Sequence, residues 1–382
     1  MGFHEFSSPY DWSRIAAYKR TAKAVFGGMI DLSVGSPVDP VPDSVRKALA
    51  VAANDPNAYG YPATAGTADL RAAIAEWFSA TRNVDLQAIH ADVVPTVGSK
   101  EGVALMASLL HFGEDDVVVQ PKVSYPTYEI GTQLAGAQVL KVDDVADVAS
   151  WRNVPGVKAV WVNSPCNPTG EVYSAERMAG IVAAAREIGA VVLSDECYAL
   201  MQWRGATNSA DDDPLQSTPC ALRSDVCAGS AEGVLVLYSL SKQSNMAGYR
   251  TAFIAGDESL IASMSAYRKQ IGQIIPGPVQ AAMAAGLRDL ESVKVQHARY
   301  RERLGVLVSA LRAYGYCTDM PDGALYVWVR AKSGDCWTDM EQLAKIGIIA
   351  SPGEFYGAPE CLRFSATASD EAIASAAERL AR

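Results

Sequence analysis

The sequence has little of what marks several protein classes. Only 20% of its 382 residues are charged, and acidic residues outnumber basic ones by 43 to 33, which gives a formal net charge of -10. This balance argues against a nucleic-acid partner, because phosphate backbones bind basic surfaces. No apolar run reaches the roughly 18 residues that a membrane-spanning helix needs, and the N-terminus lacks the basic start and apolar core of a signal peptide. We therefore expect a cytoplasmic protein with no membrane partner.

Cysteine and histidine are too scattered to indicate a disulfide framework or a metal site. The seven cysteines contain no CxxC pair, so we interpret them as reduced thiols. The four histidines lie far apart in the chain and show no ligand spacing. Metal catalysis is therefore disfavoured.

What the chain does have is a series of buried-strand patterns. Hydrophobic residues make up 49% of the sequence, enough for two domains or for one large domain with an appendage. Between about residues 92 and 257, short apolar strands alternate with helical patterns, which is typical of βαβ units around a mainly parallel sheet. The expected strands cover residues 92–97, 115–121, 137–142, 157–165, 190–198 and 233–242.

This rhythm also predicts the limits of the domains. We expect an N-terminal segment, 1–45, that contributes to a small domain and to the active site, and a large α/β domain over 46–257. A linking helix and a C-terminal small α/β domain should cover 258–382, with "GALYVWVRA" and "CLRFSATA" as strands. The polar, turn-rich stretch from about 204 to 232 is expected to be a surface excursion.

Unusual polar residues follow these apolar strands one after another. In open parallel sheets, ligands bind beyond the carboxyl ends of the strands, so such residues are candidates for a site. Taken singly, each has an ordinary explanation as a helix cap, a turn residue or a solvated charge. Their ordered coincidence favours one shared site. The candidates are Gly98, Ser99, Lys100, Tyr125, Asn167, Asp195, Tyr198, Ser239, Ser241, Lys242 and Arg250.

A pyridoxal phosphate cofactor needs the groups that this set supplies. Lys242 would form the Schiff base, because a lysine amine in a desolvated site can become nucleophilic. Asp195 would stabilise the protonated pyridine nitrogen. Asn167 and Tyr198 would donate to the phenolic oxygen, and Tyr125 would supply an aromatic ring.

The same set also offers a place for the cofactor's phosphate. A helix opens at Gly98-Ser99-Lys100, so its N–H groups point at an anion. The side chains that would add hydroxyls and a fixed positive charge are those of Ser239, Ser241 and Arg250.

These residues carry a resemblance to a known family. The stretches "YPATAGTADLR", "SPCNPTG", "SDECY", "SLSKQSNMAGYR" and "LRFSAT" resemble, in order and over essentially the whole chain, the class I and II aminotransferases of pyridoxal-phosphate-dependent fold type I. The resemblance implies a large domain with a mainly parallel sheet flanked by helices, plus a smaller C-terminal α/β domain. It also implies a homodimer with shared active sites and a ping-pong transamination between amino acids and 2-oxo acids.

The resemblance implies further residue roles. Tyr61 would reach the phosphate in the partner subunit, and Arg363 would clamp the α-carboxylate of the substrate. The family's stacking ring often lies two residues after the proline of its strand, but that position is Val123 here, so we expect the ring to come from Tyr125. The implied substrate-binding residues are Gly35, Asn167 and Arg363.

The substrate is also suggested by resemblance. The N-terminal third, "IDLSVGSPVDPVPDSVRKAL" with "YGYPATAGTADLRAAI", and the stretch "QPKVSYPTYEIGTQLAGAQV" look like actinobacterial N-succinyldiaminopimelate aminotransferases. That activity would transfer an amino group from glutamate to N-succinyl-2-amino-6-oxopimelate, giving N-succinyl-LL-2,6-diaminopimelate and 2-oxoglutarate for lysine and peptidoglycan synthesis. Such a long dicarboxylate needs a second polar contact, for which the N-terminal stretch and the region after Gly323, including Tyr326, are candidates.

Three alternatives stay open at this point. A broader aspartate or aromatic aminotransferase would share the site and differ in its substrate. A pyridoxal-phosphate-dependent cystathionine β-lyase would share the cofactor site but release ammonia and pyruvate without an oxo-acid acceptor. A non-enzymatic regulator with an aminotransferase-like ligand domain is disfavoured by the acidic charge and by the intact Lys242 and Asp195.

Overall fold

The computed structural model describes residues 11–56, 58–203, 215 and 218–382. The first ten residues, on which part of the signal-peptide argument rests, and much of the predicted surface excursion, at 204–214 and 216–217, lie outside the described residues. The chain divides into two compact units: a smaller one with the residues up to Ser36, Glu302–Met320 and Leu325–Arg382, and a larger one with Pro37–Arg301 and Pro321–Ala324. The domain limits expected from the sequence stay a prediction.

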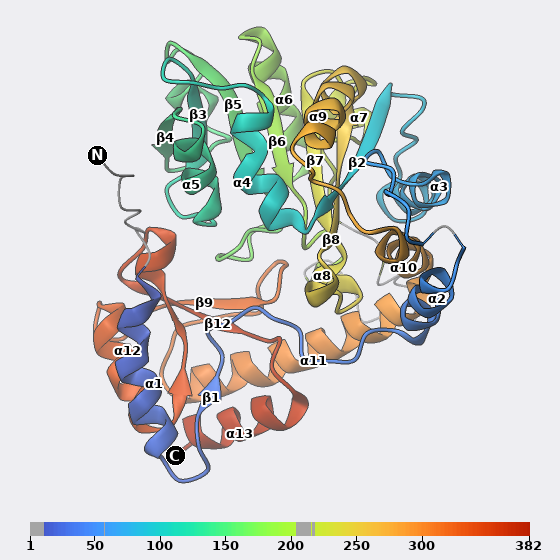
Figure 1. The fold of residues 1–382 in the computed structure, drawn as a ribbon. Helices are drawn as coiled ribbons and strands as arrows, with labels where there is room; N and C mark the ends of the chain where they lie inside the picture. Colours follow the sequence, from blue (N-terminus) through green and yellow to red (C-terminus); the bar gives the residue numbers. More distant parts are fainter. Residues whose placement is uncertain (1–10, 57, 204–214, 216–217) are drawn as a thin grey trace, which may run out of the picture. The chain divides into compact units, whose positions relative to one another are not determined.

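The larger unit is built on a seven-stranded sheet with the strand order β2-β8-β7-β6-β5-β3-β4 (Figure 1). The five strands from β7 to β4 pair in parallel, which confirms the predicted mainly parallel sheet. Strand β8, absent from the predicted strands, runs antiparallel to both β2 and β7. The strands are β2 (Ala91–Val97), β3 (Val117–Pro121), β4 (Gln138–Val142), β5 (Val157–Asn163), β6 (Val191–Asp195), β7 (Val234–Ser239) and β8 (Thr251–Asp257).

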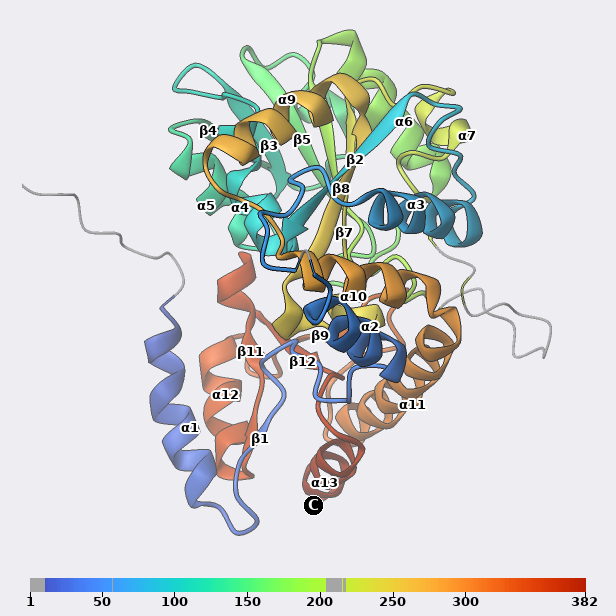
Figure 2. The ribbon, with the colours of Figure 1, turned by 45° about the vertical axis from the view of Figure 1, so that its right-hand side comes forward.

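Helices cover both faces of this sheet (Figures 1 and 2). Because side chains alternate along a strand, Leu193 and Leu235 pack with Met106 and Met264 in one apolar cluster, whereas Val192 belongs to a larger cluster on the other face. The first face carries α4 (Ser99–Leu109), α5 (Thr127–Leu134) and α9 (Glu258–Gln270). The second carries α3 (Ala68–Trp77), α6 (Ala175–Glu187) and α10 (Gly277–Arg288), and α2 (Asp43–Ala53) packs on α10.

Three strands end earlier than the sequence predicts: β5 ends at Asn163, β6 at Asp195 and β7 at Ser239. β7 ends at Ser239 because the Ser239 hydroxyl accepts the Ser241 N–H at 3.1 Å and caps the short helix α8 (Leu240–Gln243). A serine that captures a backbone N–H in this way competes with strand pairing. Likewise β6 ends at Asp195, whose Oδ1 accepts the Cys197 N–H at 3.2 Å. Lys242 therefore lies in a helix that follows the strand, and not on the strand itself.

The smaller unit contains two small sheets. The strands predicted from "GALYVWVRA" and "CLRFSATA" are confirmed as β9 and β12, which pair antiparallel in the sheet β11-β12-β9. A parallel pair joins β1 to β10. The strands are β1 (Ile30–Asp31), β9 (Tyr326–Arg330), β10 (Ile348–Ile349), β11 (Ser351–Pro352) and β12 (Cys361–Ser365), and the helices are α1 (Ile15–Ala24), α12 (Cys336–Lys345) and α13 (Asp370–Leu380).

The predicted linking helix is present as α11 (Leu290–Ala313), which begins in the larger unit and ends in the smaller one. The long helical pattern after residue 258 is thus divided into α9, α10 and α11. The remaining elements are short: η1 (Trp12–Arg14), η2 (Phe78–Arg82), η3 (Val148–Ser150), α7 (Ser224–Cys227), η4 (Ala247–Tyr249) and η5 (Gly353–Tyr356).

A buried ion pair holds the end of β6 to the second face of the sheet. Arg82 Nη2 lies 2.6 Å from Glu196 Oε2, and both side chains are almost completely buried. Glu196 Oε1 also accepts the Ser194 hydroxyl at 2.9 Å and the Ala221 N–H at 2.8 Å. Because each charge is compensated within the protein, removing one partner leaves the other charge buried and unpaired.

We predict that Arg82→Met lowers the free energy of unfolding by about 3 to 5 kcal/mol, since Glu196 then remains as an uncompensated buried charge. The matched control is Arg288→Met, because Arg288 pairs with Asp69 and Glu76 at the exposed surface. That change should lower it by less than about 1 kcal/mol. Urea-induced unfolding measures both, and equal effects would contradict the prediction.

Candidate active site

The strand register brings predicted site residues to one edge of the large sheet. Asn163 at the end of β5 lies opposite Asp195 at the end of β6. Asp195 lies opposite Leu237 in β7, two residues before Ser239. Because these three strands are parallel, their carboxyl ends meet at the same edge, where ligands of open α/β sheets bind.

Strand β8 extends this edge in the opposite chain direction. Ser239 pairs with Ala252, and Thr251 pairs with Val97 at the end of β2. Arg250, directly before β8, and Gly98, directly after β2, are therefore neighbours at the same edge. The register thus collects the ends of β2, β5, β6 and β7 and the beginning of β8.

Lys242 stands on the short helix α8, and its neighbour Gln243 anchors that helix. Gln243 is buried, accepts the Tyr238 hydroxyl at 2.7 Å, and donates its amide to Ser244 Oγ at 3.1 Å and to the Gly286 carbonyl at 3.3 Å. The Lys242 side chain is half-buried. The fold therefore fixes the backbone at Lys242 and presents its amine just beyond the end of β7.

Asp195 is a buried carboxylate at the end of the central strand β6. Its Oδ2 accepts the Tyr128 hydroxyl at 2.7 Å, and its Oδ1 accepts the Cys197 N–H at 3.2 Å. Burial raises the pKa of Asp195 above its usual value, and these hydrogen bonds act against that rise. A nearby cation would favour the charged form of such a carboxylate, so the position suits a ligand atom with a positive charge.

Cys197 connects the end of β6 to the start of α4. Burial raises the pKa of the Cys197 thiol well above its usual value, the thiol interacts with the side chains of Ser99 and Asp195, and Lys242 is close enough to act on it electrostatically. The thiol is therefore protonated and serves as a structural contact. The same interactions bring Ser99, Asp195 and Lys242 into one neighbourhood.

The start of α4 and Arg250 form a corner suited to an anion. Gly98 has a φ of +78°, and a Cβ on it would lie 2.3 Å from Arg250 Nη2. Arg250 Nη1 donates to the Ala247 carbonyl at 2.9 Å, and the hydroxyls of Ser239 and Ser241 are 2.8 Å apart. Helix N–H groups, hydroxyls and a guanidinium are the groups that bind a phosphate.

The loop after β5 lies beside Asp195. Asn163 donates its amide to the Asp195 carbonyl at 2.9 Å, and its Oδ1 accepts the Asn167 N–H at 2.8 Å. Asn167 is buried, as is Tyr198, which lies in the turn three residues after Asp195. Both predicted donors therefore belong to the same strand ends as the carboxylate.

Three other predicted residues show fewer contacts with the side chains at this edge of the sheet. Tyr125 precedes α5 and meets the Tyr128 ring edge to face, with 5.8 Å between ring centroids. Lys100 is exposed on the first turn of α4. The Tyr61 side chain is fully exposed, so within a single chain it does not join the residues at the sheet edge.

Arg363 and Gly35 belong to the smaller unit. Arg363 is 4% exposed, donates from Nη2 to the Ser33 carbonyl at 2.8 Å, and lies with its guanidinium carbon 4.0 Å from the centre of the Tyr326 ring and 4.7 Å from that of Tyr356. A Cβ on Gly35 would lie 2.2 Å from the Tyr326 hydroxyl. Tyr326 therefore packs under Arg363 and against Gly35, and the rings hold the guanidinium in one orientation.

The sequence predictions did not include Tyr128 and Asn163, although both touch Asp195. Tyr128 follows Tyr125 by three residues in the stretch "SYPTY", with Tyr125 just before α5 and Tyr128 on its first turn, and the two rings meet. Asn163 directly follows the apolar residues 159–162 and is the last residue of β5. Each therefore had a local signal, but the contact with Asp195 needs the tertiary fold.

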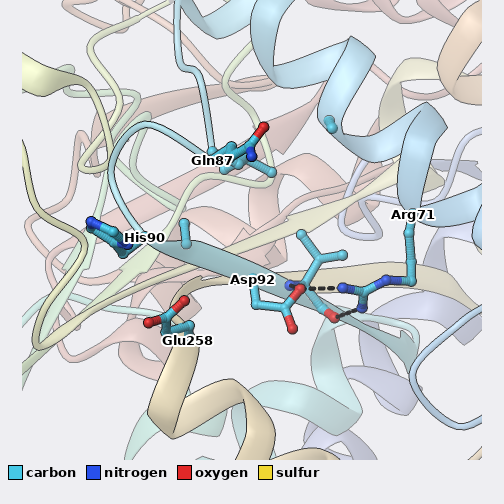
Figure 3. A pocket seen from close by; sticks show the side chains of 9 residues that line it. Arg71, Gln87, His90, Asp92 and Glu258 are labelled. Carbon is cyan, nitrogen blue, oxygen red and sulfur yellow. Dashed lines mark hydrogen bonds and ion pairs between the residues drawn. The ribbon is translucent and has the colours of Figure 1, made fainter.

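A separate hollow of about 490 Å³ lies at the opposite edge of the sheet, where β2 and α9 begin (Figure 3). Arg71 forms an ion pair with Asp92 there and donates to the Val93 carbonyl at 2.9 Å. Its guanidinium is thus engaged by the protein itself, and nothing in the hollow indicates a ligand.

No cluster of three or more His, Cys, Asp or Glu side chains in the described ranges could hold a metal ion. Among the described helices, none combines the length and apolar character needed to cross a membrane.

Comparison with known proteins gives consistent results. A family model described as aminotransferase class I and II matches residues 27–380. The chain is 40% identical over 373 residues to the 4-dedimethylamino-4-oxo-anhydrotetracycline transaminase OxyQ of Streptomyces rimosus, covering 97% of this chain and 98% of that relative. It is 40% identical over 377 residues to a probable aminotransferase of Mycobacterium tuberculosis, with coverages of 97% and 84%. Its structure is similar to that of a probable N-succinyldiaminopimelate aminotransferase from Thermus thermophilus, with a TM-score of 0.84, 27% identity and coverages of 97% and 99%.

The side chains at the sheet edge fit pyridoxal phosphate, the cofactor of that family. The phosphate fits the corner made by the start of α4 and Arg250, since both offer donors to an anion. Gly98 leaves space in this corner that a Cβ would fill. A protonated ring nitrogen matches the buried Asp195 carboxylate, and an aldehyde matches the Lys242 amine.

We predict that Gly98→Ala raises the dissociation constant for pyridoxal phosphate about tenfold or more. The new methyl group would displace the Arg250 guanidinium, and so weaken charge-assisted hydrogen bonds to the phosphate. Titration of the protein with the cofactor, followed by visible absorption, gives the constant.

The control is Gly189→Ala. Gly189 also has a positive φ, +68°, but a Cβ there meets no atom within 4 Å. A positive φ strains the backbone in both variants, and more so at Gly98, whose ψ of 155° places it in a region essentially confined to glycine. The displacement of Arg250 is specific to Gly98→Ala. Equal cofactor affinity in the two variants would contradict the assigned corner.

Proposed function

Because the chain belongs to the class I and II aminotransferases, we propose that it moves an amino group between glutamate and N-succinyl-2-amino-6-oxopimelate. The chain is a pyridoxal-phosphate-dependent aminotransferase of fold type I. The observation that carries the assignment of the site is the register at the carboxyl edge, because it gathers an amine, a buried carboxylate and an anion corner from separate strands.

Lys242 is the residue we assign to cofactor attachment and proton transfer. Pyridoxal phosphate, when bound, supplies the ring that accepts electrons from the substrate α-carbon. The Lys242 Nζ would take the proton from that carbon and deliver it to the cofactor carbon that carried the aldehyde, within the same half-reaction. Support comes from the anchored helix α8, which keeps the amine at the sheet edge, and from the proximity of Lys242 to Cys197.

The remaining roles at the sheet edge follow from the chemistry of the side chains. Asp195 stabilises the positive charge on the pyridine nitrogen. Asn167 and Tyr198 would donate to the phenolic oxygen, and the Tyr125 ring would stack on the cofactor. The residues assigned to the phosphate are Gly98, Ser99, Lys100, Ser239, Ser241 and Arg250.

Arg363 is assigned to the α-carboxylate that all the substrates share. Its planar guanidinium can form two parallel hydrogen bonds with a carboxylate, and the Tyr326 and Tyr356 rings keep that plane fixed. Gly35 belongs to the same subsite, because it leaves room for the Tyr326 hydroxyl that a larger residue would exclude.

The acceptor is proposed on the basis of similarity. The stretches around residues 30–49, 59–74 and 120–139 resemble N-succinyldiaminopimelate aminotransferases, and the Thermus thermophilus structure, which covers almost the whole chain, carries that description. A second candidate follows from the 40% identity to the Streptomyces rimosus transaminase, whose name gives its acceptor as 4-dedimethylamino-4-oxo-anhydrotetracycline. The two acceptors differ enough in size and charge for one experiment to separate them.

We also propose that the enzyme is a homodimer with shared active sites. The support is the exposure of Tyr59 and Tyr61, two neighbouring aromatic side chains that are almost fully accessible in a single chain. Large exposed rings of this kind mark surfaces that a partner covers. Tyr61 would then bind the cofactor's phosphate in the other subunit.

Single half-reactions test the proposed activity. We expect L-glutamate and N-succinyl-LL-2,6-diaminopimelate, added separately to the holoenzyme, each to convert the bound cofactor and change its visible absorption. Unacylated diaminopimelate and aspartate should react far more slowly. Lys242→Ala should bind the cofactor but show neither conversion, because no other amine is assigned to move the α-proton.

Each other outcome removes a defined part of the proposal. Conversion by glutamate and general amino acids alone would overturn the succinylated substrate. Conversion by the amine of the tetracycline-type acceptor would favour the second candidate. Release of ammonia and pyruvate from cystathionine would identify a β-lyase, and wild-type rates in Lys242→Ala would overturn the role of that lysine.

We predict that Arg363→Lys lowers kcat/KM about tenfold to a hundredfold for every amino and oxo acid substrate, because an ammonium cannot replace the paired hydrogen bonds to the carboxylate. Arg330→Lys is the matched control, since Arg330 is exposed on the neighbouring strand β9. Steady-state kinetics with two different amino donors measures the effect. A loss confined to one substrate would contradict a role on the shared carboxylate.

A further inference from the structure

Tyr128 and Asp195 form a buried hydrogen bond next to the proposed cofactor. The Tyr128 hydroxyl donates to Asp195 Oδ2 at 2.7 Å, and the Tyr128 side chain is 1% exposed. Burial, together with the adjacent Asp195, raises the pKa of Tyr128 well above its usual value. The phenol therefore stays protonated and acts as a permanent donor to the carboxylate.

The surrounding rings fix the direction in which this hydroxyl points. Tyr128 lies on α5 and stacks on Trp161 of β5, with 4.4 Å between the ring centroids and 16° between the planes. The Tyr125 ring meets its edge. Trp161 precedes Asn163 by two residues in β5, and Asn163 lies opposite Asp195, so the stack leads directly to the carboxylate. A ring held on two sides gives its hydroxyl one orientation.

A second buried pair of the same kind shows how much Asp195 depends on this donor. In the smaller unit, Asp339 accepts the Tyr316 hydroxyl at 2.8 Å, and also the N–H groups of Lys332 at 2.7 Å and Ser333 at 3.1 Å. Burial raises the pKa of Asp339, but these hydrogen bonds outweigh it and the pKa lies below its usual value.

For Asp195, in contrast to Asp339, the effect of burial on the pKa outweighs that of the hydrogen bonds. Its carboxylate oxygens accept the Tyr128 hydroxyl and the Cys197 N–H, and its pKa nevertheless lies above the usual value because of burial, with the neighbouring Glu196 charge adding to the rise. The Glu196 charge is itself paired with Arg82. With weaker support from the backbone than Asp339 has, the ionised form of Asp195 relies more on its tyrosine.

We propose that Tyr128 is a positioning residue that acts through Asp195, holding this carboxylate ionised and in one rotamer so that the proton it shares with the cofactor stays on the pyridine nitrogen. The inference rests on the proposed function, since it concerns the cofactor assigned to this edge. Without the Tyr128 donor, the proton affinity of Asp195 rises and the shared proton moves from the nitrogen to the carboxylate. The ring then accepts electrons less well.

The test compares Tyr128→Phe with Tyr316→Phe. Both remove a hydroxyl that donates to a buried aspartate and keep the ring, but Tyr316 touches no residue assigned to the cofactor. Each variant is loaded with pyridoxal phosphate labelled with ¹⁵N at the ring nitrogen, and the NMR shift of that nitrogen reports its protonation. The rate of the glutamate half-reaction is measured on the same samples.

We expect the ¹⁵N shift in Tyr128→Phe to move toward the value of an unprotonated pyridine, and the half-reaction to slow about tenfold to a hundredfold, as for loss of a hydrogen bond to a charged group. Tyr316→Phe should leave both unchanged. A wild-type ¹⁵N shift in Tyr128→Phe would overturn the inference even if the rate falls. A wild-type protein that shows no cofactor band would overturn the proposed function, and this inference with it.

A variant with a stronger donor guards against a folding defect in Tyr128→Phe. Substitution of 3-fluorotyrosine at position 128 keeps the ring and makes its hydroxyl a better donor. The ¹⁵N shift should then move in the opposite direction, toward full protonation of the nitrogen. Shifts in the same direction for both variants would indicate packing damage and would contradict the proposal.

Discussion

The antiparallel course of β8 between β2 and β7 is the constraint on which the site depends. Because β8 begins at the edge where β2 and β7 end, the residue before it, Arg250, arrives beside the start of α4. A parallel strand in this place would put its preceding residue at the opposite edge. The contact with β7 is close, since a Cβ on Gly256 would lie 1.9 Å from the Val234 carbonyl oxygen. The anion corner therefore follows from one strand direction and from a glycine that permits tight pairing.

Two adjacent acidic residues at the end of β6 serve different purposes. Asp195 and Glu196 point to different surroundings because successive side chains alternate along an extended chain. Glu196 is neutralised inside the protein by Arg82, whereas Asp195 receives only hydrogen bonds. The protein thus compensates the Glu196 charge itself, and in the proposed function the Asp195 charge is compensated by a positively charged ligand. This division keeps the two carboxylates from both being uncompensated in a buried region.

The sequence was informative where local pattern decides structure. Apolar runs predicted the parallel strands, and the polar residues after them predicted Asp195, Asn167 and Gly98 at one edge, because strand ends in a parallel sheet meet there. The same reasoning did not find β8, because "TAFIAGD" follows a polar turn and has no helix before it to suggest a strand. It also extended β7 to Lys242, because the capping action of Ser239 depends on the geometry of its own side chain.

Contacts between residues far apart in the chain could not be predicted from local sequence patterns. Tyr128 and Asp195 are 67 residues apart, and their hydrogen bond depends on how α5 packs across β5. The sequence analysis assigned an aromatic role to Tyr125, because the family's usual position for the stacking ring is Val123 here, and it did not consider Tyr128. Similarly, Met178, Ile181, Val182 and Ala185 are buried on one face of α6. Ile188 continues their helical spacing, but it is the C-terminal cap of that helix and is 36% exposed. At the end of a helix, the spacing of apolar residues no longer predicts which of them are buried, since the next residue leaves the helical path.

With Asp195 in its proposed role, the raised pKa of this residue couples cofactor loading to the thermodynamics of folding. A carboxyl whose pKa is higher in the folded than in the unfolded chain favours folding less as the pH rises from the unfolded pKa to the folded one. At neutral pH the cofactor-free chain carries that penalty, and a cation bound at Asp195 removes it. Binding and folding are thus linked, and the apoprotein is the form that opens more often to proteases. The supply of the cofactor would in this way set the lifetime of the chain as well as its activity.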